Sequence, residues 1–241
     1  MSLLTIIQTA APRFGIAVPN SAAGSSDQNI QQMVAFANEE GQELAAAHPW
    51  QALRYETHFT TLAAEDQGAV STICTAVNPQ APFQSIVNET IWNRSQRRPI
   101  FGPKSPAEWQ QLKAQFVQGP WYQYVIRGGH ILFTPVASAG DSCYFEYITS
   151  AWATNAAATV GKSVMTADDD VAAIDERLIA LGVVWRFQQA KGLDYTISFE
   201  KYDSAVKDAM AKDGGAKRLN LLGYDTSVWP GVLVPAGNWG M

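Results

Sequence analysis

The segment "ATVGKS" is the stretch of the sequence that is most similar to a nucleotide-binding motif. It ends in Gly161, Lys162 and Ser163. In a phosphate-binding loop, such a lysine and the surrounding backbone N–H groups hold the phosphates of a nucleotide. That motif needs another glycine five residues before Gly161, where this chain has Ala156. No buried strand leads into the segment either. We therefore interpret it as a loop before a helix, and we predict that the protein binds no cofactor.

Metal chemistry is not indicated by the other candidate ligands. The three histidines, His48, His58 and His130, are not at metal-ligand spacing. The run Asp168–Asp170 could form an acidic metal cluster, but carboxylates are also typical of a helix N-terminus, where they stabilise the helix dipole. We favour the helix interpretation and predict no metal site.

Catalysis by carboxylates would require two of them to face each other across a cleft, as in glycoside hydrolysis. Glu39, Glu40 and Glu43 are close together in the sequence, but we expect them on the polar side of a single helix. No serine lies in a nucleophile-elbow context. We therefore assign no catalytic residue and predict that the protein is not an enzyme.

A basic segment, "NRSQRRP", is the clearest candidate for a partner-binding surface. It contains Arg94, Arg97 and Arg98. Aromatic residues flank it on both sides: Trp92, Phe101 and Trp109. One interpretation is a solvated loop; the other is a surface for an acidic partner or for DNA backbone passing close by. Because arginine and tryptophan are common interface anchors, we take the three arginines as candidate partner-binding residues.

The composition indicates a folded protein without a nucleic-acid-binding charge. Of 241 residues, 47% are hydrophobic and 16% charged, and the net charge is −5. These values support a core and argue against a basic DNA-binding domain. Cys74 and Cys143 are two reduced thiols or, alternatively, one disulfide. No run of 18 apolar residues predicts a membrane-spanning helix, and we interpret the apolar start as a helix rather than a secretion signal.

The apolar periodicity predicts helices at both ends of the chain. The stripes of residues 3–14 and 30–44 have helical spacing, and Pro12 should kink or end the first helix. Two further stripes, at residues 171–185 and 195–210, predict a helical hairpin, and we expect Asp168–Asp170 to begin its first helix.

The middle of the chain favours antiparallel strands. Residues 53–60 alternate with period two. Gly128 and Gly129 predict a hairpin, and we expect "SCYFEYITS" to add a third strand as a meander. A capping box from Ser105 to Glu108 predicts one helix within this region.

These elements predict the α+β class: a helical bundle from both chain ends with an inserted antiparallel β-sandwich-like domain and an extended C-terminal tail. We expect four segments along the chain. They are residues 1–50, the N-terminal helices of the bundle; 51–165, the β-rich domain with a short helical insertion; 166–215, the C-terminal helical hairpin; and 216–241, the tail.

The tail is apolar, and its only charged side chain between Leu219 and Met241 is Asp225. Prolines and glycines favour extended structure there. Four large apolar residues would be costly to leave in water: Trp229, Val232, Val234 and Trp239. The tail either folds back onto its own chain or docks on a neighbour as an added strand or through aromatic anchors. We therefore include these four among the candidate partner-binding residues.

Several stretches, in a consistent order over nearly the full length, carry a resemblance to a known family. They are "LLTIIQTAAPRFGI", "MVAFANEEGQEL", "TIWNRSQRRPIFGP", "SPAEWQQLKA", "IRGGHILFTP", "GDSCYFEYI", "IALGVVWRFQQAKGLDY" and "PGVLVPAGNW". The chain resembles the head-to-tail adaptor family of short-tailed bacteriophages, which includes the tail tubular A proteins. The resemblance implies a helical bundle with an inserted β-sandwich.

The resemblance also implies a function in the virion, at the head–tail junction, after synthesis in the host cytoplasm. Such adaptors are typically homo-oligomeric, dodecameric rings that bind the portal protein and carry the tail nozzle protein. Double-stranded DNA passes through the lumen without sequence-specific binding, and no membrane is involved. The alternatives are another structural or tail completion protein, or a virion-associated peptidoglycan hydrolase.

Overall fold

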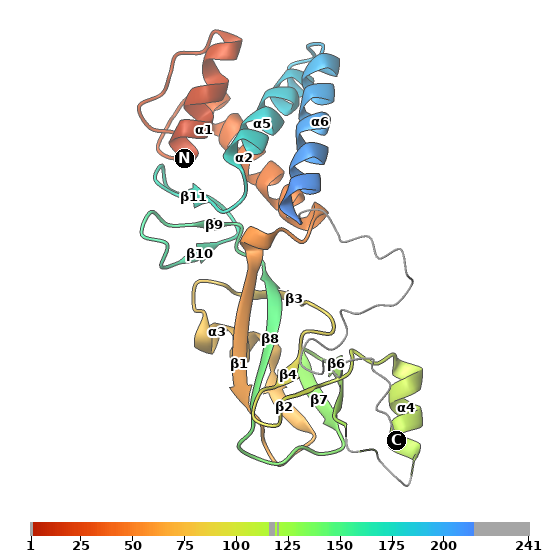
Figure 1. Ribbon diagram of the computed structural model, residues 1–241. Coiled ribbons are helices and arrows are strands. Elements are labelled where there is room, and N and C mark those ends of the chain that lie inside the picture. The colour runs from red at the N-terminus through yellow and green to blue at the C-terminus, as the bar shows by residue number, and fades with distance from the viewer. Residues whose placement is uncertain (1, 116–118, 120, 215–241) are drawn as a thin grey trace, which may run out of the picture.

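The computed structural model describes residues 2–115, 119 and 121–214. Four of the described α-helices gather at one end of the molecule, and most strands lie at the other end (Figure 1). All the strands named below pair in antiparallel fashion. The predicted α+β class is therefore confirmed.

The helical end brings together segments from both halves of the chain. Helix α5 packs against the three other α-helices of this end. The helices are α1 (Leu3–Ala10), α2 (Gln28–Ala47), α5 (Glu176–Ala190) and α6 (Thr196–Asp213), with the 3-10 turn η1 (Ala11–Phe14) after α1. Pro12 lies within η1, so the α-helix ends before it, as the sequence predicts.

Two glycines allow close packing in the helical end. A Cβ atom on Gly182 of α5 would lie 2.3 Å from Cγ of Glu40 on α2. A Cβ atom on Gly41 would lie 2.3 Å from the Trp152 ring. These contacts bring α5 and α2 together and seat the indole against α2. Because α5 is surrounded by neighbours, residues 178–184 of this helix are all buried, which removes the one-sided stripe typical of a surface helix.

The prediction that Asp168–Asp170 begin a helix is wrong, because α5 begins eight residues after Asp168, at Glu176, and its cap is Asp175. The Asp170 carboxylate is buried and accepts hydrogen bonds from the backbone N–H groups of Thr166 and Ala167 at 2.7 and 2.9 Å. It therefore stabilises a loop, in which aspartate can cap N–H groups as it does at a helix start.

Among the described residues, the β-rich end consists of two sheets and two short α-helices, and a 3-10 turn leads into its first strand. The larger sheet has the order β1-β8-β4-β5, with β3 also paired to β8, and the smaller one has the order β2-β7-β6. The elements are η2 (Gln51–Leu53), β1 (Arg54–Thr60), β2 (Asp66–Ala69), α3 (Val70–Val77), β3 (Phe83–Ile86), β4 (Trp92–Asn93), β5 (Arg98–Pro99), α4 (Pro106–Ala114), β6 (Gln123–Arg127), β7 (His130–Thr134) and β8 (Ser142–Thr149).

Aromatic side chains from both sheets meet in a second hydrophobic core. The ring of Phe59 on β1 lies 6.0 Å from that of Phe133 on β7 and 6.2 Å from that of Phe145 on β8. Along β1, Thr57 and Phe59 are buried while Glu56 and His58 are exposed. The predicted alternation is confirmed. The capping box at Ser105 and the Gly128–Gly129 hairpin are also present.

The predicted three-strand meander is wrong. Strand β7 pairs with β6 and β2, whereas β8 pairs with β1 in the other sheet. The connection between them runs through residues 135–141 and contains Pro135 and Gly140. Asp141 and Gly140 exchange backbone hydrogen bonds with Thr61, which follows β1. The chain therefore crosses between sheets, as it does in a sandwich.

A small third sheet lies between the two ends. It has the order β10-β9-β11, with β9 (Ala153–Thr154), β10 (Gly161–Lys162) and β11 (Val171–Ala172). Trp152, Ala153 and Met165 pack in the helical core rather than in the β-rich core. The expected segment limits at residues 50, 165 and 215 stay predictions, and these three residues show how the 51–165 segment contributes to the bundle.

Candidate partner-binding surfaces

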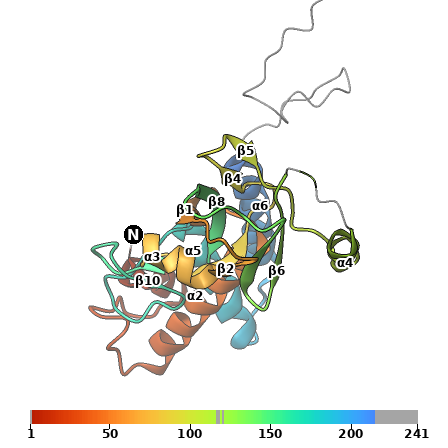
Figure 2. The ribbon, with the colours of Figure 1, turned by 90° about the horizontal axis from the view of Figure 1, so that it is seen from below.

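The β4–β5 hairpin lies at the margin of the β-rich end (Figure 2). It contains the three candidate arginines, Arg94, Arg97 and Arg98. Its turn is built by polar side chains. The buried Asn93 donates from Nδ2 to Asp141 at 2.9 Å and accepts from the backbone N–H of Gln96 at 2.9 Å. Arg97 then adopts the left-handed region, with a φ of 55°. Arg94, Arg97 and Arg98 are all exposed.

The structure separates Arg94 from the other two arginines. Its guanidinium forms an ion pair with Glu56 of β1 and lies 3.6 Å above the centre of the Tyr144 ring of β8. These contacts hold the side chain against its own sheet. A guanidinium held in this way has less freedom to meet a partner. The sequence did not predict these stabilising contacts of Arg94 within its own chain.

Arg97 and Arg98 are more available than Arg94 for contact with a partner protein. The Arg98 guanidinium lies 5.2 Å from the centre of the exposed Trp121 ring, a cation–π contact. Within residues 2–115, 119 and 121–214, Arg97 forms no ion pair or side-chain hydrogen bond. The pair therefore presents two positive charges and an aromatic side chain, a composition typical of interface anchors.

A shallow pocket of about 290 Å³ opens beside the hairpin and contains an unpredicted group of carboxylates. Glu56 and Glu146 lie directly opposite each other in the β1–β8 register, and Glu89 lines the same pocket. Like charges in this position repel. Arg94 pairs with Glu56, and Arg54 lies 3.8 Å from Glu146. The arginines therefore offset the repulsion. Only the strand register brings these acids together, which explains why sequence spacing missed them.

The other four candidate residues, Trp229, Val232, Val234 and Trp239, lie outside the described residues, as does the whole segment Leu219–Met241. Their role in partner binding stays a prediction.

The phosphate-loop-like segment has a structural role. Lys162 donates from Nζ to the two carboxylate oxygens of Asp170, at 2.6 and 2.8 Å. Burial of Asp170 acts to raise its pKa, but the hydrogen bonds from Lys162, Thr166 and Ala167 outweigh burial and hold the pKa below its ordinary value. The lysine is thus neutralised within the chain. The interpretation as a loop before a helix is wrong, because Gly161 and Lys162 form β10 of the small third sheet and the next helix begins at Glu176.

The acidic residues of α2 are arranged differently from the prediction. Glu40 is fully buried rather than on a polar face. The Arg186 guanidinium of α5 donates from Nε to Glu40 at 2.8 Å and from Nη1 to Glu39 at 2.7 Å, and it also pairs with Glu43. The Tyr202 hydroxyl of α6 donates to Glu40 as well. We name these five residues the Arg186 cluster.

Burial raises the pKa of Glu40, and the hydrogen bonds from Tyr202 and Arg186 reduce that rise without cancelling it. Burial also raises the pKa of Tyr202, and its bond to Glu40 adds to the effect. The sequence signal for this arrangement is a single arginine within the otherwise apolar segment 178–187 of α5, one helical turn after Gly182. A buried charge of this kind needs a partner.

Histidines and cysteines form no reactive group in the part of the chain that the structure describes. Both cysteines are free and buried, and burial raises the pKa of each to about 12. His48 lies 3.2 Å from Asp213, and His130 lies 2.9 Å from Asp66. Among residues 2–115, 119 and 121–214, no three His, Cys, Asp or Glu side chains are placed to hold a metal. No helix among these residues is long and apolar enough to cross a membrane.

A family model described as SU10 adaptor protein matches residues 1–228. A comparison with curated proteins found no match.

Proposed function

Since the chain belongs to the SU10 adaptor protein family, a family of phage head-to-tail adaptors, we propose that it forms a homo-oligomeric ring between the portal and the tail nozzle of a virion. The family match over residues 1–228 carries this proposal. Family membership indicates a structural protein of the virion rather than a catalyst. It also implies interaction with portal and tail proteins. The resemblance described above gives twelve copies for the ring.

The two-ended shape supports an adaptor. The helical end and the β-rich end have separate cores and lie at opposite ends of the molecule (Figure 1). A protein with this shape presents a different surface to each of two neighbours. An adaptor requires this property, because the portal and the nozzle are different proteins.

Two surfaces are the candidate contacts with those neighbours. Arg97 and Arg98 on the β4–β5 hairpin offer exposed positive charge beside Trp121. The segment Leu219–Met241 offers apolar anchors, among them Trp229 and Trp239. Aromatic residues and arginine dominate the energetics of many protein interfaces.

Passage of the genome through the ring is compatible with the charge. DNA-binding proteins attach to the phosphate backbone through clustered lysine and arginine. This chain has a net charge of −5, so a ring of many copies is strongly anionic. An anionic lumen would repel DNA phosphates and let the duplex slide.

The proposal is tested by native mass measurement of the protein, first alone and then mixed with the portal ring of the same phage. We expect a closed ring either alone or on the portal, and its mass gives the number of copies. A protein that stays monomeric and ignores the portal ring would contradict portal docking. The nozzle protein would then be the next partner to test.

A further inference from the structure

A basic hollow lies on one side of the helical end. It has a volume of about 220 Å³. Residues of α5 line it together with residues of α1 and η1 and one residue of α6. Its floor is apolar and consists of Ile6, Ala180 and Leu181. Arg13, Arg177 and Lys201 line it, together with the single acid Glu176. All three basic side chains are exposed, and within the described residues none of them forms an ion pair or side-chain hydrogen bond.

An acidic ridge lies on another side of the same bundle. Glu39 and Glu43 are four residues apart on α2, so their side chains are neighbours on one helix face. Their side chains are 51% and 60% exposed although both pair with Arg186. Each carboxylate has several hydrogen-bond acceptor positions, so each can accept another donor from solvent or from a partner.

The hollow and the ridge cannot meet within one molecule. Arg177 lines the hollow, and Arg186 binds the ridge. Nine residues separate them, about two and a half turns of α5, so their side chains leave opposite sides of that helix. The helical end is therefore basic on one side of α5 and acidic on the other.

We propose that the basic hollow of one copy binds the acidic ridge of a second copy of this chain. Arg13, Arg177 and Lys201 then contact Glu39 and Glu43 of the neighbour. The inference rests on the proposed function in that it names the contact by which copies assemble. It assigns self-assembly to the helical end and leaves the β4–β5 hairpin free for a different partner.

The charges of the two surfaces and the fixed positions of the ridge carboxylates favour a second copy of this chain as the partner that binds in the hollow. The hollow has three positive side chains against one negative, and the ridge offers two carboxylates at helical spacing. Arg186 already holds both carboxylates in place, so little side-chain freedom is lost when they meet the hollow. Because the two surfaces differ, the contact is head-to-tail, and its repetition generates a ring or a filament rather than a closed dimer.

The first test joins the two surfaces chemically. Lys201→Cys is made in one sample and Glu43→Cys in another, and a short bismaleimide cross-linker is added to each and to their mixture. The native cysteines are buried with raised pKa values, so they do not compete. We expect a cross-linked pair in the mixture and none in either sample alone.

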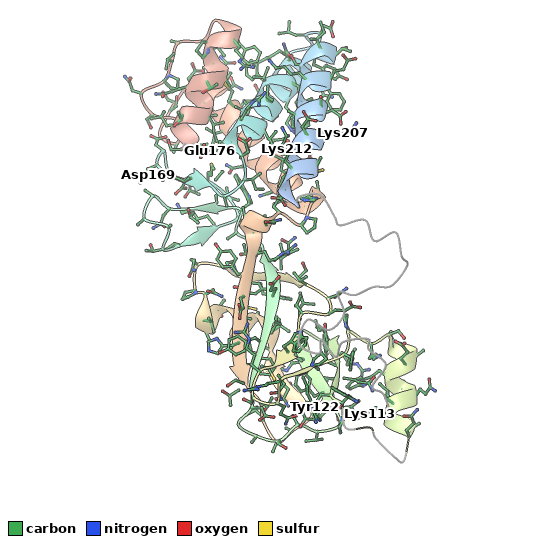
Figure 3. All side chains as sticks on the ribbon, viewed as in Figure 1. Lys113, Tyr122, Asp169, Glu176, Lys207 and Lys212 are labelled. Atoms are coloured by element: carbon green, nitrogen blue, oxygen red, sulfur yellow. The ribbon has the colours of Figure 1, made fainter. Side chains whose placement is uncertain are left out.

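Lys207→Cys is the matched control for Lys201→Cys. Lys207 is exposed on the same helix, α6 (Figure 3), but six residues away and therefore on a different face. Its mixture with Glu43→Cys should not cross-link. Equal cross-linking of the control, cross-linking of Lys201→Cys by itself, or no mixed product at high protein concentration would each overturn the inference.

The second test exchanges charges between the surfaces. Arg177→Glu with Lys201→Glu reverses the hollow, and Glu39→Lys with Glu43→Lys reverses the ridge. Each variant alone should associate at least about ten-fold more weakly, with a larger loss at low salt. The mixture should regain association, because reversed hollow then meets reversed ridge and native meets native. Circular dichroism and thermal melts verify folding, and no recovery in mixtures of folded variants would contradict the proposal.

Portal binding separates this inference from the proposed function. If the hollow variants keep portal binding and keep self-association, the copies assemble through another surface and only the inference fails. If they lose portal binding while self-association is unchanged, the hollow binds an acidic partner instead, which also overturns the inference. If the Lys201→Cys and Glu43→Cys mixture gives the expected cross-linked pair but the native protein never binds the portal, the adaptor proposal fails and the inference stands.

Discussion

Arg186 places a guanidinium within the mostly buried stretch of α5, where it meets three carboxylates of α2. The buried member, Glu40, also accepts from Tyr202 of α6. Glu40 of α2 thus ties three helices together, because it accepts hydrogen bonds from α5 and from α6. A buried ion pair often adds little compared with apolar packing, but removal of one partner is costly because it leaves an uncompensated buried charge.

At this scale we predict that Arg186→Met lowers the free energy of unfolding by about 3–5 kcal/mol at pH 7. The pKa of Glu40 is already raised, chiefly by burial, and loss of the arginine raises it further. At a pH below 4.5, the ordinary pKa of glutamate, the Glu40 carboxyl is mostly protonated in both the folded and the unfolded state. The deficit should therefore be small there and grow as the pH rises through the folded pKa. Urea unfolding at several pH values measures it.

Two variants control this experiment. Lys207→Met removes an exposed ion pair with Asp203 on α6 and should change stability by no more than about 0.5 kcal/mol. Glu40→Gln in the Arg186→Met background removes the buried charge and should recover part of the loss. A deficit that is equal at all pH values would show that lost packing, and not the Glu40 charge, causes it.

Residue types alone did not predict the Arg186 cluster. Glu39, Glu40 and Glu43 fit a polar helix face by periodicity, since two of them are exposed and only one is buried. The distinction depends on a residue 146 positions away along the chain. Sequence spacing on one helix carries no information about such a partner. The same limit applies to Glu56 and Glu146, which only the β1–β8 register brings together.

Local signals at the scale of helices and strands were more informative. Helix limits followed Pro12 and the Ser105 capping box, and the two-residue turn at Gly128 produced its hairpin. Two wrong predictions, the helix start at Asp168–Asp170 and the three-strand meander, arose where one local sequence pattern is compatible with two structures. Asp168–Asp170 can cap a helix or a loop, and a strand after a turn can join its predecessor or cross to a facing sheet. Tertiary contacts decide both cases.

For the β4–β5 hairpin we predict that reversing Arg97 and Arg98 together to Glu weakens docking to the portal or nozzle protein about ten-fold at low salt. The loss should shrink as salt rises, because added ions screen exposed charges. Binding measured between about 50 and 500 mM salt tests this prediction.

Arg127→Glu is the matched control, since Arg127 is also exposed but lies on the β6–β7 hairpin. It should change binding little. A loss that is independent of salt would indicate that the hairpin acts through packing, for example through Trp121, rather than through charge.

Two hydrophobic cores divide the whole molecule. One belongs to the helices and the small third sheet, and the other to the two larger sheets. The α+β class, the helices at both ends of the chain and the strands between them followed from periodicity. The sequence could not predict that Trp152 and Met165 pack in the helical core, because the apolar character of a residue does not tell which of two cores it joins.

At this scale we predict that a chain ending at residue 218 stays folded but assembles more weakly. The described helices and strands end before this point, so both cores are retained. Thermal melting should shift by only a few degrees, while native mass should show fewer or smaller assemblies. A truncated protein that unfolds would show instead that the segment Leu219–Met241 belongs to the core of its own chain.

The pairing of β1 with β8 has a further consequence. Arg54 and Ile148 face each other in the register, so the chain leaves the helical end and returns to it at neighbouring positions, about 5 Å apart. A segment with adjacent ends can be cut out and replaced by a short linker without stretching the remainder, as with domains inserted into loops. The β-rich end can therefore be removed or exchanged as a unit while the helical end stays a continuous frame.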